Sequence, residues 1–289
     1  MSVFEFLSVF NIFLSITASL GNALILVALY KESSLHPPTK LLFRCLAFTD
    51  LCVGVISQPL FVVFLLSSVT PGVNWKFIFC IDKLYKASSF ILCQVSVFTS
   101  SAISVDRLLA LLSGLRYRQV VTLPRVRAVI TCFWLVGTLC GAMNFWNESI
   151  AFTVAFALTT FSVTTSAFSY AKIFRRLRQY KFQVQTAPQG QPNGRQTSLN
   201  IARYKKSVSS VLWVQLSLIA CYIPFIVVVT LITYRGMPGN KLSEIAFCVT
   251  ATLTYLNSSL NPILYCWRIK TVRLAAKDTI NQLNCCKSF

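Results

Sequence analysis

The stretch Ser101–Thr122, SAISVDRLLALLSGLRYRQVVT, passes from an apolar segment into a group of charges. Asp106 and Arg107 lie side by side where the apolar run ends, and a loop with Arg116 and Arg118 follows. An apolar run that stops at charged residues is typical of a helix that leaves a membrane. This stretch therefore predicts a membrane boundary close to Arg107.

The composition of the whole chain agrees with this interpretation. Of 289 residues, 55% are hydrophobic and only 12% are charged, whereas soluble domains carry about 25% charged residues. Seven apolar stretches are long enough to cross a hydrocarbon core, which takes about 20 helical residues. They are Phe6–Tyr30, Leu41–Ser67, Phe77–Leu112, Val126–Phe145, Ile150–Ile173, Val208–Tyr234 and Leu242–Trp267. We predict an all-α membrane protein, in which residues 1–289 form one seven-transmembrane helix bundle.

The basic residues predict the orientation of this bundle. The net charge is +19, and 22 of the 27 lysines and arginines flank the ends of spans that share one side with the C-terminal tail. The other side has only Lys76, Lys83, Lys86, Arg235 and Lys241. Because basic loops stay in the cytoplasm, we expect the N-terminus outside and the C-terminus inside. The positive charge is thus a topology signal, and we expect no nucleic-acid partner.

Polar side chains on different spans fall at one depth. Asp50 is ten residues from Lys40, or about 15 Å, and counting from other charges places Asn22, Ser96 and Asn261 in the same layer, with Asn257 and Ser258 one turn away. A carboxylate inside a membrane is costly and often functional. Oxygen atoms from several helices could hold a small hard cation such as Na⁺. A neutral Asp50 satisfied by hydrogen bonds is the alternative.

The spans also contain features that favour two alternative packings. Arg107 can change partners at the membrane boundary, and the hydroxyls of Tyr170 and Tyr265 lie on spans that end near it. Pro224 and Pro262 each remove a backbone hydrogen bond within a span, so we expect kinks in the sixth and seventh helices.

These residues together resemble the rhodopsin-like (class A) G-protein-coupled receptors. The motifs that carry the resemblance are Gly21–Asn22, LAFTD at Leu46–Asp50, SVDRL at Ser104–Leu108, Trp134, CYIP at Cys221–Pro224 and NSSLNPILY at Asn257–Tyr265. The reduced second extracellular loop and the missing proline in the fifth helix are similar to the melanocortin, adenosine and cannabinoid branch. The resemblance implies a plasma-membrane receptor that opens its cytoplasmic face to a heterotrimeric G protein.

The resemblance also implies roles for single residues. Asp106, Arg107, Tyr170, Tyr222, Pro224, Asn261, Pro262 and Tyr265 would form the switch that couples to the G protein. Asn22, Asp50, Ser96, Asn257, Ser258 and Asn261 would form an allosteric Na⁺ site. No other cofactor is expected.

Three features depart from the family pattern. Leu108 replaces a tyrosine, Tyr222 replaces a tryptophan, and the family's usual disulfide cannot form because the short loop at 144–149 has no cysteine. Cys80 and Cys248 could instead pair on the outer side, and Asn147 begins a glycosylation sequon close to the membrane.

The C-terminal tail is amphipathic. Apolar residues recur every three or four positions and basic residues line much of the rest of its circumference, so we predict a cytoplasmic helix eight over about 268–283 that lies on membrane lipid. The adjacent Cys285 and Cys286 favour palmitoylation after this helix, with a plain pair of free thiols as the alternative.

The expected ligand pocket lies between the outer halves of the third, fifth, sixth and seventh helices. Ser89 stands where amine receptors of this family have an aspartate, and Tyr255 stands where opsins have the retinal lysine, so both ligand classes are disfavoured. We predict a small-molecule, lipid-like or short-peptide ligand. The candidate pocket residues are Gln58, Ser89, Phe156, Tyr222, Phe225 and Tyr255.

Two other functions remain open from the sequence. A multi-span transporter or channel is one, although the chain has no internal repeat of the kind that transporters show. A receptor-like protein with weak G-protein coupling is the other, because Leu108 and Gly114 lie in the coupling region. An enzyme is not expected, because the single histidine, His36, belongs to no catalytic or zinc-binding pattern.

Overall fold

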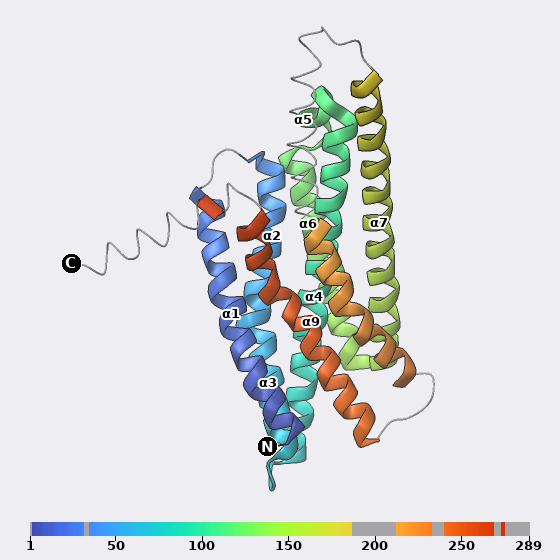
Figure 1. Ribbon diagram of the computed structural model, residues 1–289. Helices are drawn as coiled ribbons and strands as arrows, with labels where there is room; N and C mark the ends of the chain where they lie inside the picture. The colour runs from blue at the N-terminus through green and yellow to red at the C-terminus, as the bar shows by residue number, and fades with distance from the viewer. Residues whose placement is uncertain (1, 32–34, 187–211, 233–239, 269–272, 275–289) are drawn as a thin grey trace, which may run out of the picture.

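The computed structural model describes residues 2–31, 35–186, 212–232, 240–268 and 273–274. All regular secondary structure in these ranges is helical, and the long helices run up and down beside one another in a bundle (Figure 1). The N-terminus marks one end of the bundle, called the N-terminal end, where the turn at residues 70–74 also lies (Figure 1). The other end, called the opposite end, has the turns at residues 35–36 and 121–122.

Most of the helices are longer than the spans predicted from the sequence. The helices are α1 (Val3–Lys31), α2 (Pro37–Cys52), the π-helix η1 (Val53–Ser57), α3 (Gln58–Val69), α4 (Trp75–Ser113), the 3₁₀ turn η2 (Gly114–Arg116), α5 (Tyr117–Val120), α6 (Leu123–Trp146), α7 (Glu148–Thr186) and α9 (Lys241–Arg268). A further helix, Leu212–Ile232, lies between α7 and α9 in sequence and is called the 212–232 helix.

Six helical segments in the described residues are long and apolar enough to cross a membrane, namely α1, α2 to α3, α4, α6, α7 and the 212–232 helix. The seventh predicted span corresponds to α9, which has 28 residues and is long enough but less apolar. Its polar Asn257, Ser258 and Asn261 are buried in the bundle and do not face outward. The predicted helix eight and Cys285 and Cys286 lie outside the described residues, apart from the helical pair 273–274.

Short-range signals explain where several helices begin and end. The Oδ1 atom of Asn74 caps α4 by accepting the backbone N–H of Lys76 at 2.9 Å. Proline occupies the first turn of α2 and of α6, where a missing N–H costs nothing. Gly114 has a φ of 47°, a left-handed value that ends α4.

The helix from Pro37 to Val69 changes its winding at one point. The π-helical turn η1 occupies Val53–Ser57, and Pro59 follows in the first turn of α3. Proline has no N–H to donate, so the chain before it is free to adopt a wider hydrogen-bonding pattern. This π-helical turn is an irregularity that the sequence analysis, which predicted kinks at Pro224 and Pro262, did not include.

The helices pack around α4, which contacts α2, α3, α6 and α7, while α1 packs against α2, α3 and α9. The contact between α1 and α9 is close. A Cβ atom built on Gly21 would lie 2.9 Å from Cγ of Pro262, so a side chain here would force the two helices apart. Three apolar clusters fill the interior of the described residues: one around Phe61 and Tyr85, one around Leu46 and Ile173, and a smaller one around Val97 and Leu218.

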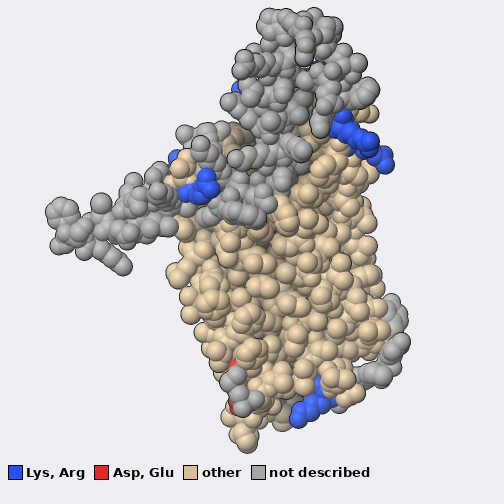
Figure 2. Space-filling model, viewed as in Figure 1, with Lys and Arg blue, Asp and Glu red and all other residues tan. Residues whose placement is uncertain are grey.

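The outside of the bundle is apolar over a wide band. In Figure 2, lysine and arginine lie toward the two ends of the visible face, and the zone between them shows no charged side chain. Large apolar side chains such as Leu20, Leu139 and Phe161 are more than 60% exposed. A protein surrounded by hydrocarbon needs an apolar outer surface and backbone groups that are hydrogen-bonded within helices, and this bundle has both.

Candidate functional site: a polar layer, an arginine cluster and a cavity

A buried carboxylate lies at the centre of the polar layer. Asp50 of α2 is fully buried. Ser96 of α4 donates a hydrogen bond to its Oδ1 at 3.3 Å. From α9, Ser258 donates to Oδ1 at 2.8 Å and Asn261 donates to Oδ2 at 2.7 Å. The carboxylate therefore links three helices, and charge-assisted hydrogen bonds of this kind are among the stronger ones.

Asn22 and Asn257 are two further buried residues that the sequence placed in this layer. Asn22 does not hydrogen-bond to Asp50; its Nδ2 donates to the carbonyl oxygens of Ala18 at 2.9 Å and Ser258 at 3.0 Å. Asn257 is also buried. Within the described residues, the side-chain oxygens of Asn22, Asn257 and Asn261 are buried and accept no hydrogen bond. Three oxygen acceptors of the layer thus remain unsatisfied by protein donors.

At the opposite end of the bundle, Asp106 is held by two hydroxyl groups. Thr39 donates to its Oδ2 at 3.0 Å and Tyr117 donates to its Oδ1 at 2.7 Å, while the two hydroxyl oxygens lie 3.0 Å apart. Nη2 of Arg107 lies 3.3 Å from Oδ2 of the same carboxylate. The acid–base pair found in the sequence is therefore the centre of a cluster formed by α2, α4 and α5.

The two predicted tyrosines lie near this cluster. The hydroxyl of Tyr170 accepts a hydrogen bond from Ser104 at 3.2 Å. The Tyr265 ring meets the Phe43 ring edge-on at 5.6 Å, and the Arg107 guanidinium lies 6.0 Å from the centroid of the same Phe43 ring. Phe43 is thus near both Arg107 and Tyr265. These contacts could not be predicted from the sequence, because an apolar residue near the end of a span is unremarkable.

Tyr117→Phe is expected to destabilise the protein. Burial raises the pKa of Tyr117 to about 12, with a contribution from its hydrogen bond to Asp106, so the phenol stays protonated and donates at neutral pH. Losing a donor to a charged acceptor should lower the free energy of unfolding by about 1–2 kcal/mol. Melting temperatures of the purified protein measure this effect. The control Tyr30→Phe, at an exposed tyrosine, should leave the melting temperature unchanged; equal values for both variants would contradict the prediction.

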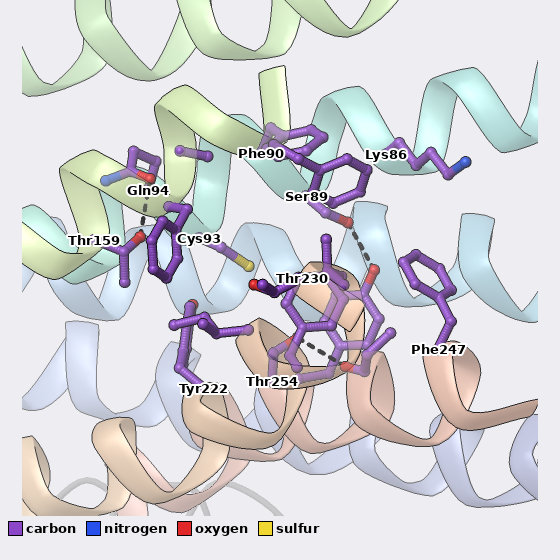
Figure 3. A pocket seen from close by; sticks show the side chains of 18 of the residues that line it. Lys86, Ser89, Phe90, Cys93, Gln94, Thr159, Tyr222, Thr230, Phe247 and Thr254 are labelled. Atoms are coloured by element: carbon purple, nitrogen blue, oxygen red, sulfur yellow. Dashed lines mark hydrogen bonds between the residues drawn. The ribbon is translucent and has the colours of Figure 1, made fainter. Parts of the chain in front are cut away.

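A cavity of about 160 Å³ opens among α4, α7, the 212–232 helix and α9, toward the N-terminal end (Figure 3). Five of the six residues that were candidates for the ligand pocket line it, namely Ser89, Phe156, Tyr222, Phe225 and Tyr255. Pro224 lies next to two of them in the 212–232 helix.

Gln58, the sixth residue predicted for the pocket, does not line this cavity. Its side chain is fully buried at the start of α3, next to the π-helical turn, and neither amide atom has a partner in the described residues. A residue near the outer half of a span can face the bundle interior without reaching the cavity, and the sequence does not distinguish these cases.

The cavity has a few polar groups within an aromatic wall. The hydroxyls of Ser89 and Tyr255 lie 2.6 Å apart, and Thr159 donates to Oε1 of Gln94 at 3.4 Å; dashed lines mark both pairs in Figure 3. Phe90, Phe152 and Phe247 complete much of the apolar lining. Lys86 lies at one edge, close to Phe247.

The sequence reasoning missed Lys86, Phe90, Cys93 and Gln94, although a signal was available. Lys86 lies three residues before Ser89 and Cys93 lies four residues after it on the same helix, and side chains at such spacing share a face. Extending the pocket from Ser89 along α4 would have identified Lys86 and Cys93, whereas Phe90 and Gln94 are not at this spacing.

The cysteine pair that the sequence left possible on the outer side, Cys80 with Cys248, is not formed in the structure. Cys80 is an exposed free cysteine on α4, whereas Cys248 is a fully buried free cysteine on α9. Burial among apolar side chains accounts for Cys248 as a packing residue.

The sequence matches the profile of a family described as "7 transmembrane receptor (rhodopsin family)" over residues 21–149 and 141–265. The chain belongs to this family. The receptor is therefore a divergent, rhodopsin-like G-protein-coupled receptor and a multi-pass membrane protein. Membership of a receptor family also agrees with the expectation that the chain is not an enzyme.

Several curated receptors are similar to this one over most of its length. The guinea pig (Cavia porcellus) histamine H2 receptor is 25% identical over 97% of this chain and 80% of its own length. Melanocortin receptor 5 of Pan troglodytes is 25% identical over 96% of this chain and 83% of its own, and adenosine receptor A3 of Ovis aries is 25% identical over 90% and 84%. The names of these relatives refer to ligands of different chemical classes.

Proposed function

We propose that this receptor binds a small-molecule, lipid-like or short-peptide ligand in the cavity and activates a heterotrimeric G protein at the opposite end of the bundle. The observation that carries the proposal is the position of both sites on one helix. α4 brings Lys86 and Ser89 to the cavity and Asp106 and Arg107 to the other end. Lys86 and Arg107 are 21 residues apart, which is about 30 Å along a helix.

The proposed orientation places the cavity outside the cell and Arg107 at the cytoplasmic side of the plasma membrane. The distribution of lysine and arginine along the sequence supports it. On this assignment an extracellular ligand reaches the cavity from the N-terminal end, and the G protein meets the end that carries the Arg107 cluster.

The proposed coupling uses helices that contribute to both ends. A ligand between Ser89, Tyr222 and Tyr255 contacts α4, the 212–232 helix and α9. Pro224 and Pro262 weaken the backbone hydrogen bonding of the last two helices, so their inner halves can change packing at a modest cost. A ligand shifts this equilibrium by its differential affinity for the two packings. The shift would free Arg107 from Asp106 to face the G protein and the tyrosines Tyr170 and Tyr265.

The test is nucleotide exchange by a panel of purified heterotrimeric G proteins with the receptor in lipid nanodiscs. Basal GTPγS uptake should exceed that with empty nanodiscs, and Arg107→Ala should abolish the excess while the melting temperature shows a folded protein. The matched control Arg118→Ala removes an exposed charge from the same end and should keep most of the activity. If no G protein in the panel responds to the receptor or binds it in the nucleotide-free state, the proposal is wrong.

We also propose Na⁺ as an allosteric ligand of the polar layer. The donor set fits this cation, because Na⁺ takes oxygen ligands and the buried side-chain oxygens of Asn22, Asn257 and Asn261 lack donors beside the Asp50 carboxylate. Asp50, Ser96 and Ser258 would supply further oxygens. A bound cation would offset the buried negative charge and favour the helix packing in which these side chains are close together.

A further inference from the structure

Lys86 is the one formally charged residue among the described side chains that line the cavity. Its side chain is only 14% exposed. The Nζ atom lies 2.6 Å from Oε1 of Glu148 and 3.0 Å from Oδ2 of Asp82, and 5.9 Å from the centroid of the Phe247 ring. The two carboxylates hold the ammonium group at the edge of the cavity, and neither of them lines the cavity itself.

The rest of the lining suits a hydrocarbon chain. Five phenylalanines surround the cavity, and they interlock: the Phe152 ring lies 4.9 Å from Phe90 and 6.4 Å from Phe225, and Phe247 lies 5.6 Å from Phe225. Binding of a hydrocarbon chain against these rings is favourable because it removes apolar surface of the chain and of the rings from water. A ligand that satisfies both parts of the cavity has an apolar body and a negative group at one end.

We propose that the cavity binds a single-chain aliphatic carboxylate, with the carboxylate paired to Lys86 and the chain among the phenylalanines. This inference rests on the proposed receptor function, since it names the ligand class of the same cavity. No covalent step is involved, because binding exchanges one ion pair for another.

Lys83 makes this exchange feasible. Its Nζ lies 3.3 Å from Oε2 of Glu148 and 3.2 Å from the carbonyl oxygen of Asn144. When a ligand carboxylate takes the place of Glu148 on Lys86, Glu148 keeps Lys83 as a partner and no carboxylate is left buried alone. An amine ligand has no such exchange available, because it would have to displace Lys86 from acids that do not line the cavity.

The exchange would also reach beyond the cavity. Glu148 is the first residue of α7, and its ion pairs with Lys83 and Lys86 tie that end of α7 to α4. A ligand that competes for Lys86 removes one of the two ties. Binding would therefore loosen the start of α7 relative to α4.

Access from the lipid side agrees with an amphipathic ligand. Thr153 and Phe156 of α7 and Thr230 of the 212–232 helix line the cavity and are also exposed. Phe156 is eight residues into α7, or about 12 Å along the helix. The cavity thus reaches the apolar outer surface of the bundle at a distance from the N-terminal end, where the hydrocarbon chain of a ligand dissolved in lipid can enter.

Direct binding of radiolabelled decanoate to the purified receptor in nanodiscs tests the proposal, with empty nanodiscs as background. We expect saturable binding. Unlabelled decanoate should compete for the site, and decanol and decylamine should compete far less well. Lys86→Gln should weaken binding at least ~10-fold, the ratio that 1.4 kcal/mol produces. Lys86→Arg should restore much of the affinity because it restores the positive charge.

Two neighbouring variants separate ligand binding from a structural role of Lys86. Glu148→Gln removes the competing carboxylate and should tighten decanoate binding, whereas Lys83→Gln leaves the displaced Glu148 without its second cation and should weaken it. If Lys86 were merely structural, Lys86→Gln and Glu148→Gln would weaken binding together. That result, no saturable decanoate binding, or tighter binding of decylamine would each overturn the proposal.

The assay contains no G protein, so its outcome is independent of the proposed coupling. Failure of nucleotide exchange with intact decanoate binding would reject the coupling alone. Intact exchange without decanoate binding would reject the ligand class alone.

Discussion

Gly141→Val is expected to cause a large drop in the melting temperature of the purified receptor. A Cβ atom on Gly141 of α6 would lie 2.5 Å from Cγ1 of Ile91 and 3.0 Å from the carbonyl oxygen of Ala87, both on α4. One turn away, a Cβ on Gly137 would lie 3.1 Å from the carbonyl oxygen of Ile91. The two glycines therefore bring two helix backbones together, as small residues do in membrane bundles. Overpacking of this kind costs about 1–3 kcal/mol.

Two further variants test the cause. Leu139→Val changes an apolar side chain between the two glycines that is 64% exposed, and it should leave the melting temperature nearly unchanged. Gly141→Ala combined with Ile91→Ala should lose less stability than the sum of the single variants, because the second change removes the closest clashing atoms. If the stability losses of Gly141→Ala and Ile91→Ala simply added, or if Leu139→Val lowered the melting temperature as much as Gly141→Val, close contact between α4 and α6 would not be the reason for glycine at position 141.

Asp50→Asn is expected to abolish the response of the receptor to sodium. If Na⁺ binds the folded wild type, replacing choline chloride by NaCl at equal ionic strength should raise the melting temperature. The stabilisation is about 1.4 kcal/mol when Na⁺ is at ten times its dissociation constant. Asparagine has the shape of aspartate but no charge, so it keeps the packing and loses the main attraction for a cation. Thermal unfolding in the two salts measures the difference.

The control for this prediction is Glu244→Gln, which removes an exposed acid on α9 and should leave the sodium response intact. Asp50→Leu adds a second comparison: the donors on Ser96, Ser258 and Asn261 lose their acceptor, and leaving buried donors unsatisfied costs about 1–3 kcal/mol each. A sodium response that survives in Asp50→Asn, or is missing in the wild type, would reject the Na⁺ site.

The depth of the polar layer could be predicted, but its partners only in part. Counting residues from the flanking charges placed Asp50, Ser96, Ser258 and Asn261 together because a helix rises by a fixed distance per residue. The rotation of each helix is not readable in this way. Asn22 consequently reaches the backbone of Ser258 and not the Asp50 carboxylate.

The same limitation applies to the cavity. Ser89, Tyr222 and Tyr255 were placed from their positions in the family motifs, whereas Gln58 was assigned on depth alone and lies in the interior. Lys86 was counted only as an outer basic residue. Its meaning depends on Glu148, which is 62 residues away in sequence.

The amino-acid sequence by itself determined the class of fold, the number and order of the spans and the residues available at each depth. Span length, apolar character and loop charge act locally along the chain, so they can be read from it. The tertiary structure alone decided which of those residues meet. The hydrogen bonds of Asp106 to Thr39 and Tyr117, the closeness of Phe43 to Arg107 and Tyr265, and the ion pairs of Lys86 all depend on how the helices rotate and approach. Those rotations are set by the packing of many side chains at once, such as the close contact at Gly137 and Gly141, and not by any single segment.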